Sequence, residues 1–232
     1  MTRWSTGRLV AGLHALIDRT EPADRPSVVG VTGIDTSGKS CLAAALTTRL
    51  RAAGRRVQPI HVDDFHRPRA ERHHPELPGP EELYRFGIDH DRLRRELLEP
   101  IRHRGGVDAR LILLDHYTDT WGLDRTYHVD AATVVLVEGI FLLRPELRPY
   151  IDLMVFLHVD EATALERAAA RDVPLLGAEV LERYRRKYLP GQRAHLAAHP
   201  PEDHADVIVD NRDHAFPKVL KWPGRPPDDV RP

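Results

Sequence analysis

The residues from Gly33 to Ser40 have the types and spacing needed to hold phosphate groups. They fit the P-loop pattern G-x-x-x-x-G-K-[ST] without a mismatch. In such a loop the backbone N–H groups surround phosphate oxygens, Lys39 reaches the β- and γ-phosphates, and the Ser40 hydroxyl binds Mg²⁺. The sequence therefore predicts a nucleotide site. Its expected residues are Gly33, Asp35, Thr36, Ser37, Gly38, Lys39, Ser40 and Cys41.

The segments on both sides of the loop support this prediction, because a P-loop joins a buried strand to a helix. Residues 28–31 are apolar and mostly β-branched, as in a buried parallel strand. After the loop, apolar residues recur at helical spacing up to Leu50, and Gly54 suits the helix end. The alternative is a glycine turn with an incidental Lys-Ser pair. For Cys41 we favour a packing role over a redox role.

A pair of carboxylates follows the next expected strand, Arg55–Val62. Pro59 weakens that strand or places it near a sheet edge. Asp63 and Asp64 then lie at its carboxyl end, which faces the ligand crevice in an open α/β sheet. One of them could act as general base toward a hydroxyl, or hold Mg²⁺ through water. The alternative is an Asp pair that makes a turn or caps a helix.

Further charged residues could complete a phosphotransferase site. Residues 133–137 form an apolar strand that ends in Glu138, which is the Walker-B pattern of a Mg²⁺-binding carboxylate. Arg167 and Arg171 share one face of a helix that Asp160 is expected to cap. Such a pair can neutralise a transferred phosphoryl group. An incidental Glu and a solvated helix side remain the respective alternatives.

Two polar segments are candidates for contact with a second substrate. Residues 67–80 are rich in proline and histidine, and we interpret them as a mobile surface loop over an acceptor site. Residues 115–127 contain His116, Tyr117, Asp119 and Trp121, and could either contact substrate or be solvated. Between these segments we expect a helix capped by Asp91 and a short strand at residues 110–114.

Composition limits the classes of protein that fit. The 232 residues are 41% hydrophobic, which excludes a disordered chain, and 34 Lys+Arg against 35 Asp+Glu argue against a general nucleic-acid binder. One cysteine and no transmembrane or signal segment predict a cytoplasmic protein without membrane partners. We expect one domain at residues 1–216, with a helix at 4–17 and a lid at about 167–190. A Pro-rich tail at 217–232 is expected to be extended or disordered.

The order of these motifs resembles that of the uridine kinase / phosphoribulokinase group of P-loop kinases. The resemblance runs from about Val28 to Asn211 and covers most of the chain. Besides the P-loop it depends on residues 62–66, residues 135–140, the Arg171-Asp172 pair, residues 205–209, and Tyr184 with Pro190. It implies a three-layer α/β P-loop fold, in which a parallel sheet is flanked by helices and carries a small lid.

The resemblance also implies roles for individual residues. Asp63 matches a carboxylate proposed as base and indirect Mg²⁺ ligand, and Glu138 matches the second acidic metal partner. Arg171 matches a lid arginine that contacts phosphates, whereas Arg167 is a looser match. The expected acceptor contacts are Asp63, His66, Tyr84, Asp115 and Tyr117. The expected metal ligands are Ser40, Glu138 and Asp63.

The implied activity is ATP- and Mg²⁺-dependent phosphorylation of a small-molecule hydroxyl, and a nucleoside such as uridine or cytidine is favoured. Leu114-Asp115-His116 and Leu83-Tyr84-Arg85 depart from the family pattern where the acceptor would bind, and the lid Gly-Arg is missing from residues 172–179. A modified nucleoside, a ribosyl compound or a pantothenate-like alcohol is therefore an alternative acceptor. An ATP-dependent switch without an acceptor is a second class. We expect no nucleic-acid partner, and homo-oligomerisation stays open.

Overall fold

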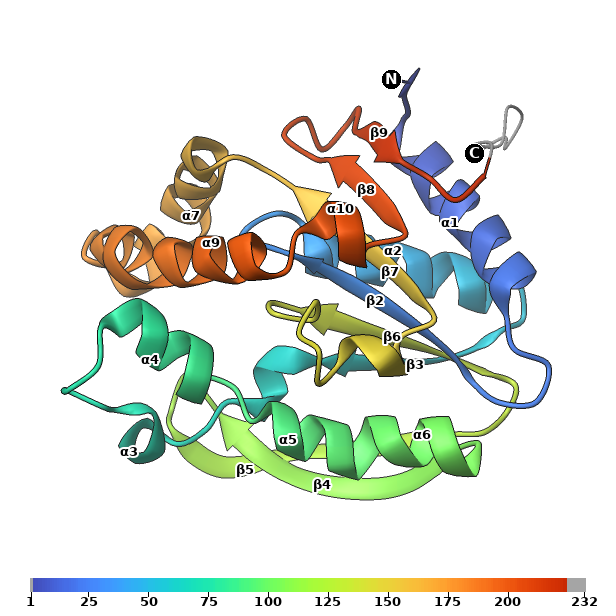
Figure 1. Ribbon diagram of the computed structural model, residues 1–232, viewed down its shortest axis with the longest axis horizontal. Helices are drawn as coiled ribbons and strands as arrows, with labels where there is room; N and C mark the ends of the chain where they lie inside the picture. The colour runs from blue at the N-terminus through green and yellow to red at the C-terminus, as the bar shows by residue number, and fades with distance from the viewer. Residues whose placement is uncertain (1, 225–232) are drawn as a thin grey trace.

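The computed structural model describes residues 2–224, and a seven-stranded sheet forms its centre (Figure 1). The strand order is β1-β9-β8-β7-β2-β6-β3. The strands from β8 to β3 run parallel, and β9 and β1 add to the β8 side as antiparallel strands. The strands are β1 (Thr2–Arg3), β2 (Ser27–Gly33), β3 (Arg56–His61), β6 (Thr133–Gly139), β7 (Leu153–His158), β8 (Val207–Asp210) and β9 (Lys218–Lys221).

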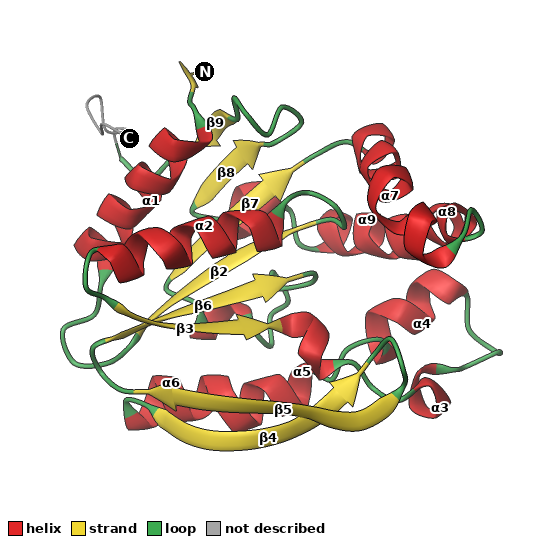
Figure 2. Ribbon diagram, turned by 180° about the vertical axis from the view of Figure 1, so that it is seen from behind, coloured by secondary structure: helices red, strands yellow, loops and turns green. Residues whose placement is uncertain are grey.

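Side chains alternate between the two faces of this sheet along each strand, and both faces are covered by other elements. Val29 packs on one face with helices α1 (Thr6–Thr20) and α2 (Lys39–Ala52), which lie side by side in Figure 2. Val28 packs on the other face with the elements that follow β3. These are α5 (His90–Leu93), α6 (Glu99–Arg104) and the hairpin β4 (Val107–Asp115) with β5 (Thr120–Val129). The three-layer α/β fold is confirmed.

Strand β3 lies at the edge of the sheet, as Pro59 predicted. It pairs with β6 alone, and Pro59 lies opposite Leu136. Because proline has no N–H to donate, it fits an edge strand and would interrupt a central one. Placing β3 at the edge also brings the segment that follows it, with Asp63 and Asp64, to one side of the P-loop.

Most of the remaining helices lie beyond the carboxyl ends of the parallel strands, where Figures 1 and 2 both show α4, α7 and α9, whereas α10 precedes β8 at its amino end. The Asp160 carboxylate accepts a hydrogen bond from the Thr163 N–H at 2.8 Å, so it caps α7 as expected. The helices are α3 (Arg69–Arg72), α4 (Gly79–Phe86), α7 (Glu161–Leu176), α8 (Val180–Arg183), α9 (Leu189–Ala198) and α10 (Pro201–His204).

Two helical runs continue through a proline by widening the turn before it. A π-helical turn at Arg94–Leu98 precedes Pro100, and another at Tyr184–Tyr188 precedes Pro190. A proline in an α-helix removes one hydrogen bond and clashes with the carbonyl four residues earlier, and a wider turn relieves that clash. The helical run from α8 through α9 is therefore continuous.

Three expectations about the middle of the chain were wrong. Residues 120–127 of the expected polar segment belong to β5, whose mostly exposed residues lack an apolar pattern. The 67–80 segment contains helices α3 and the start of α4. The cap of α5 is Asp89, whose carboxylate accepts from the Arg92 N–H at 3.0 Å, and not Asp91.

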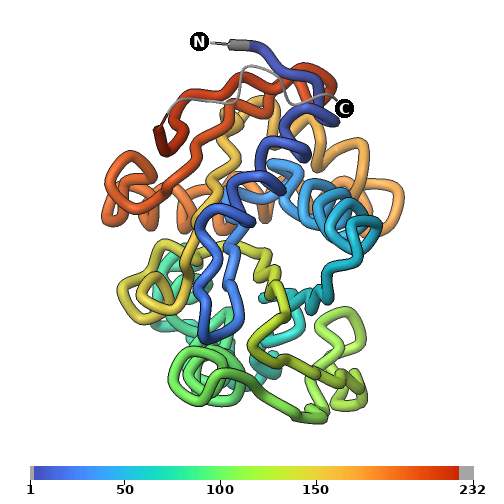
Figure 3. The backbone as a smooth tube through the Cα atoms, turned by 90° about the vertical axis from the view of Figure 1, so that its right-hand side faces the viewer, coloured from blue at the N-terminus to red at the C-terminus, as the bar shows by residue number. Residues whose placement is uncertain are grey.

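The domain also extends past residue 216. Strand β9 lies within the expected tail and pairs with both β8 and β1, so that part of the tail belongs to the sheet. Figure 3 shows the segment before β9 beside the start of α1, where the Trp4 N–H donates to the Pro217 carbonyl at 2.9 Å. Residues 225–232 lie outside the described residues. Within residues 2–224, no helix combines the length and apolar character needed to cross a membrane.

Candidate active site

Two glycines give the P-loop its shape. Gly33 has φ +155°, and a Cβ there would lie 2.4 Å from the Leu157 carbonyl oxygen. Gly38 has φ +97°, and a Cβ there would lie 2.7 Å from Nδ2 of Asn211. The loop connects β2 to α2, so its N–H groups and the positive end of α2 converge. The predicted nucleotide residues from Gly33 to Ser40 therefore line one concave loop.

The side chains of Lys39 and Ser37 in the loop can donate hydrogen bonds to an anionic ligand. The Lys39 side chain is buried, and its Nζ donates to the Ile34 carbonyl at 2.9 Å. The Ser37 hydroxyl is buried without a hydrogen-bond partner among residues 2–224. Leaving such a group unpaired costs roughly 1–3 kcal/mol. A phosphate oxygen in the loop would accept from both groups, so the loop fits a phosphate ligand.

Glu138 lies beside the P-loop because β6 is the neighbour of β2. One Glu138 carboxylate oxygen accepts from the Ser40 hydroxyl at 3.1 Å, and the other lies 2.8 Å from Nδ1 of His61. The hydrogen bond from Glu138 raises the pKa of His61. The structure thus brings the two predicted ligands Ser40 and Glu138 together, and adds His61, which we had not predicted.

The structure separates the two carboxylates that follow β3. Asp64 is bound by Arg125 of β5, with the Nε–Oδ2 and Nη2–Oδ1 pairs 2.7 and 3.3 Å apart. The Asp63 side chain is exposed and has no hydrogen bond with any described residue. Asp64 therefore anchors the hairpin, and Asp63 is the carboxylate left available for a ligand.

Asp35 connects the P-loop to helix α9. Its N–H donates to Oε1 of Gln192 at 2.8 Å, and Nε2 of Gln192 donates to its Oδ2 at 2.7 Å. Burial raises the pKa of Asp35, the charges of Lys39 and Arg171 lower it, and the charge of Asp63 raises it. Asp35 therefore lies within electrostatic reach of both predicted cations and of the free carboxylate.

Arg171 is held in place by a bidentate ion pair. Its guanidinium donates to the Asp172 carboxylate at 2.7 and 3.0 Å and to the Tyr184 hydroxyl at 3.1 Å. The Tyr184 hydroxyl in turn donates to Asp172 at 2.7 Å. The Asp172 hydrogen bonds raise the pKa of Arg171, so this guanidinium stays charged.

Arg167 lies one turn earlier on α7 and contacts different groups. Its guanidinium donates to the carbonyl oxygens of Thr36, Asn211 and Arg212 at 3.2, 2.7 and 3.0 Å. The two arginines share a helix face as predicted, but Arg167 joins the P-loop to the end of β8. Arg171 is the arginine whose charge lowers the pKa of Asp35.

Three aromatic rings contact one another in series beside the main chain of Asp63, and the first pair is stacked. Nδ1 of His66 lies 2.7 Å from the Asp63 carbonyl oxygen. The His66 ring stacks on His116 with centroids 4.8 Å apart and planes at 22°, and His116 lies 4.0 Å from the Tyr117 ring. Tyr117 is 75% exposed, so the stack has a free outer end. The stack brings His66 and Tyr117, two of the predicted acceptor contacts, close to Asp63.

The other two predicted acceptor contacts have structural partners. The Asp115 carboxylate accepts from the Tyr117 and Thr118 N–H groups at 2.9 and 3.4 Å, and these bonds lower its pKa and shape the β4–β5 turn. The Tyr84 ring is covered by the Arg144 guanidinium at 3.7 Å and meets Phe141 edge-on at 5.3 Å. Tyr84 therefore belongs to a separate aromatic cluster.

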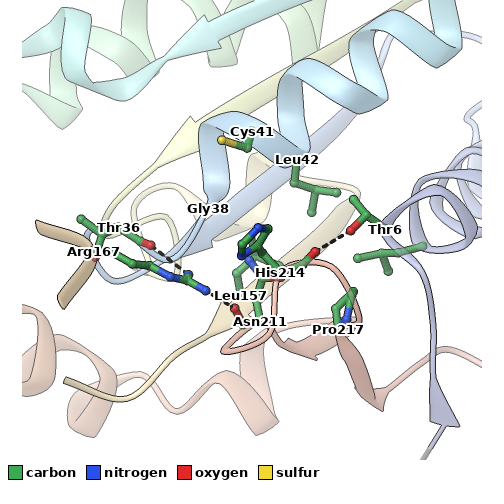
Figure 4. Close-up of a pocket in the computed structure, with 11 residues that line it drawn as sticks. Thr6, Thr36, Gly38, Cys41, Leu42, Leu157, Arg167, Asn211, His214 and Pro217 are labelled. Carbon is green, nitrogen blue, oxygen red and sulfur yellow. Dashed lines mark hydrogen bonds between the residues drawn. The ribbon is translucent and has the colours of Figure 1, made fainter. Parts of the chain in front are cut away.

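A cavity of about 380 Å³ lies on the other side of the P-loop (Figure 4). Cys41 is exposed and lines it, so the expected packing role for this cysteine was wrong. The cause is the direction of the first turn of α2, which turns residue 41 away from the sheet while Leu42 is buried. The cavity residues are Thr6, Leu9, Thr36, Gly38, Cys41, Leu42, Leu157, Arg167, Asn211, His214 and Pro217.

Sequence reasoning missed three residues of the site: His61, Gln192 and Asn211. His61 carried a usable signal, because it lies at the carboxyl end of the same expected strand, just before the Asp63-Asp64 pair. Gln192 and Asn211 belong to no short motif. Their hydrogen bonds join segments that are 157 and 174 residues apart, so the sequence alone holds no sign of them.

The buried His195 makes stability depend on pH. It is 4% exposed, neither ring nitrogen has a hydrogen-bond partner among the described residues, and burial lowers its pKa to about 3. Below pH 6.5 this histidine therefore binds a proton in the unfolded chain but not in the folded chain. The free energy of unfolding consequently decreases as the pH is lowered. Between pH 7.5 and pH 5, we expect the free energy of unfolding to decrease by about 2 kcal/mol less in His195→Phe than in the parent. Urea unfolding of both proteins at the two pH values checks this, and equal losses would contradict it.

Comparisons with known proteins agree with this geometry. The family model described as "Methylmalonyl Co-A mutase-associated GTPase MeaB" matches residues 10–69, which include the P-loop. A uridine kinase of Limosilactobacillus reuteri is 27% identical over 188 residues, covering 80% of this chain and 83% of that protein. Uridine-cytidine kinase B of Dictyostelium discoideum is 28% identical over 199 residues, covering 83% and 77%.

A solved structure has the same fold over nearly its whole length. It is described as a possible uridine kinase from Bacillus stearothermophilus, with a TM-score of 0.69 and 27% identity over 87% of this chain and 97% of that one. These similarities in sequence and fold support a P-loop kinase that resembles uridine kinases.

Proposed function

We propose that the protein transfers the γ-phosphoryl group of ATP to a hydroxyl of a nucleoside of the uridine or cytidine type. The observation that carries the proposal is the Asp63 carboxylate, which has no partner among residues 2–224 and interacts electrostatically with the P-loop residue Asp35. A carboxylate kept free beside a phosphate loop is suited to accept the proton of an attacking hydroxyl.

The donor set beside the loop fits Mg²⁺. Ser40 and Glu138 supply a hydroxyl and a carboxylate that already share a hydrogen bond, and Asp63 follows the adjacent strand. Mg²⁺ keeps several waters and needs only one or two protein carboxylates beside substrate phosphates. When bound here, it would offset the negative charge of the phosphates.

The chain's own residues would then divide the work. Lys39 and the loop N–H groups would hold the donor phosphates, and Asp63 would orient and deprotonate the acceptor hydroxyl. Arg171, kept charged and oriented by Asp172 and Tyr184, would offset charge on the group in transit.

A planar acceptor is supported by the ring stack beside Asp63. The His66 and His116 rings cover each other, the Tyr117 ring is exposed at the end of this group, and the charge of Asp63 acts on His116. A heteroaromatic base gains stacking energy from such rings, whereas an aliphatic alcohol does not. The names of the relatives agree, since several are called uridine kinase.

Acceptor-dependent release of ADP tests the proposal. Purified protein with ATP and Mg²⁺ is assayed with uridine, cytidine, pantothenate or no acceptor, and mass spectrometry identifies the phosphorylated product. We expect release with uridine or cytidine and a nucleoside monophosphate as product. Release that is equal without acceptor would favour a nucleotide-dependent switch, and release with pantothenate alone would overturn the nucleoside assignment.

A further inference from the structure

His61 and Glu138 lie side by side at the carboxyl ends of two neighbouring strands. Strands β3 and β6 run parallel, and their register pairs His61 with Glu138 (Figure 2). Side chains of residues paired in this way lie on the same face of a sheet. Val57 and Leu136, an even number of residues earlier on the same strands, pack on the face that α1 and α2 cover. The side chains of His61 and Glu138 therefore lie on the face where α2 carries Ser40.

Two hydrogen bonds hold the Glu138 carboxylate, one on each oxygen. Nδ1 of His61 lies 2.8 Å from Oε1, and the Ser40 hydroxyl donates to Oε2 at 3.1 Å. An ionised carboxylate only accepts hydrogen bonds, so Nδ1 carries the proton of this one. The last torsion of a glutamate side chain has a broad range of allowed angles, so contacts of this kind set it. The bond from His61 therefore fixes the plane in which Oε2 faces Ser40.

The two partners differ in how much they depend on this contact. Glu138 is 7% exposed, and within residues 2–224 only the His61 and Ser40 side chains bond to its carboxylate. A carboxylate buried to this extent needs hydrogen bonds to remain charged. The His61 side chain is 47% exposed and lies outside the apolar clusters that pack on the sheet. Loss of the imidazole would therefore leave the core packed and free one oxygen of Glu138.

We propose that His61 is a positioning residue for the metal site: its Nδ1–H donor holds the Glu138 carboxylate so that Oε2 and the Ser40 hydroxyl face one Mg²⁺ position. This inference rests on the proposed magnesium role of Ser40 and Glu138. Removing a group that hydrogen-bonds to a metal ligand without touching the metal lowers metal affinity about 10- to 100-fold. His61 would thus determine how strongly Mg²⁺ enhances the binding of nucleotide.

Two substitutions of His61 separate the hydrogen bond from the rest of the ring. His61→Leu removes the donor, whereas His61→Asn keeps an N–H donor the same number of bonds from Cα as Nδ1. His128→Leu is the control, because Nδ1 of His128 lies 3.0 Å from the Asp108 carboxylate in a similar pair between β5 and β4. Calorimetry on the full-length protein measures binding of a non-hydrolysable ATP analogue with Mg²⁺ and, separately, with EDTA.

With EDTA, all three variants should bind the analogue within about threefold of the parent, because the P-loop itself is unchanged. With Mg²⁺, we expect His61→Leu to bind it about tenfold more weakly than the parent. His61→Asn and His128→Leu should stay within about threefold of the parent under the same condition. Equal affinities of His61→Leu and the parent with Mg²⁺, an equal loss with Mg²⁺ and with EDTA, or no recovery in His61→Asn would overturn the proposal.

The response of the parent protein to Mg²⁺ separates this inference from the proposed function. No acceptor is present in the measurement. A parent that binds the analogue more tightly with Mg²⁺ but phosphorylates no nucleoside would therefore refute the proposed function and still decide this test. An affinity of the parent that is the same with Mg²⁺ as with EDTA would overturn the inference, because Glu138 would then hold no metal.

Discussion

Replacing Asp63 by asparagine is expected to lower the turnover number about 10²- to 10⁴-fold, the range for loss of a positioned general base. Asparagine keeps the size of the side chain but cannot accept the proton of the hydroxyl. Because the Asp63 side chain is exposed and bonds to no described residue, the fold should be unaffected. Steady-state rates of ADP release with saturating ATP and acceptor measure the effect.

The neighbouring carboxylate supplies the matched control. Asp64→Asn breaks the pair with Arg125, so it should cost roughly 1.5–3 kcal/mol of stability and change turnover only a few-fold. Thermal unfolding of both variants separates the two effects. A turnover for Asp63→Asn within tenfold of the parent would remove Asp63 from the role of base.

Replacing Lys39 by alanine should lower the turnover number roughly 10²- to 10³-fold, the cost of losing one charged or polar group that stabilises transition-state charge. The buried Nζ is directed into the P-loop by its bond to the Ile34 carbonyl, so no other cation of the loop can replace it. The same ADP-release assay and the affinity for ATP measured by calorimetry would report the loss.

Lys221 offers a control with similar local chemistry. Its Nζ also donates to backbone carbonyl oxygens, those of Glu202 and Ala205, but at the edge of the sheet. Lys221→Ala should therefore keep nearly full turnover while losing comparable hydrogen bonds. If Lys39→Ala also kept nearly full turnover, the P-loop would not be the donor site.

The fold was predictable from sequence wherever a strand or helix has its own pattern. The β-branched runs of β2 and β6 and the spacing in α1 and α2 all predicted elements that the structure contains. The hairpin strand β5 was missed, because six of its ten residues are exposed and it is held by its partner β4. An apolar pattern in a sequence reflects which residues are buried. A strand whose side chains are mostly solvated therefore has little apolar pattern by which to predict it.

For the site, the sequence predicted where the functional residues lie in the fold better than it predicted which side chains they contact. Asp63 and Asp64 are adjacent and chemically identical, and only the arrival of Arg125 from the hairpin distinguishes them. Arg167 and Arg171 are likewise equivalent as helix residues. Arg167 donates to carbonyl oxygens just after β8, whereas Asp172 and Tyr184 orient Arg171. Such choices depend on contacts between segments far apart in the chain, which no local spacing encodes.

The pair of hydrogen bonds between Asp35 and Gln192 has a mechanical consequence. Gln192 is 2% exposed within α9, which packs against α4, so a shift of α9 is transmitted directly to the middle of the P-loop. An acceptor that moves α9 on entering would change the affinity of the loop for nucleotide, and by linkage nucleotide would change the affinity for acceptor by the same factor. One buried glutamine thus gives a direct physical route by which movement of α9 would couple the binding of the two substrates.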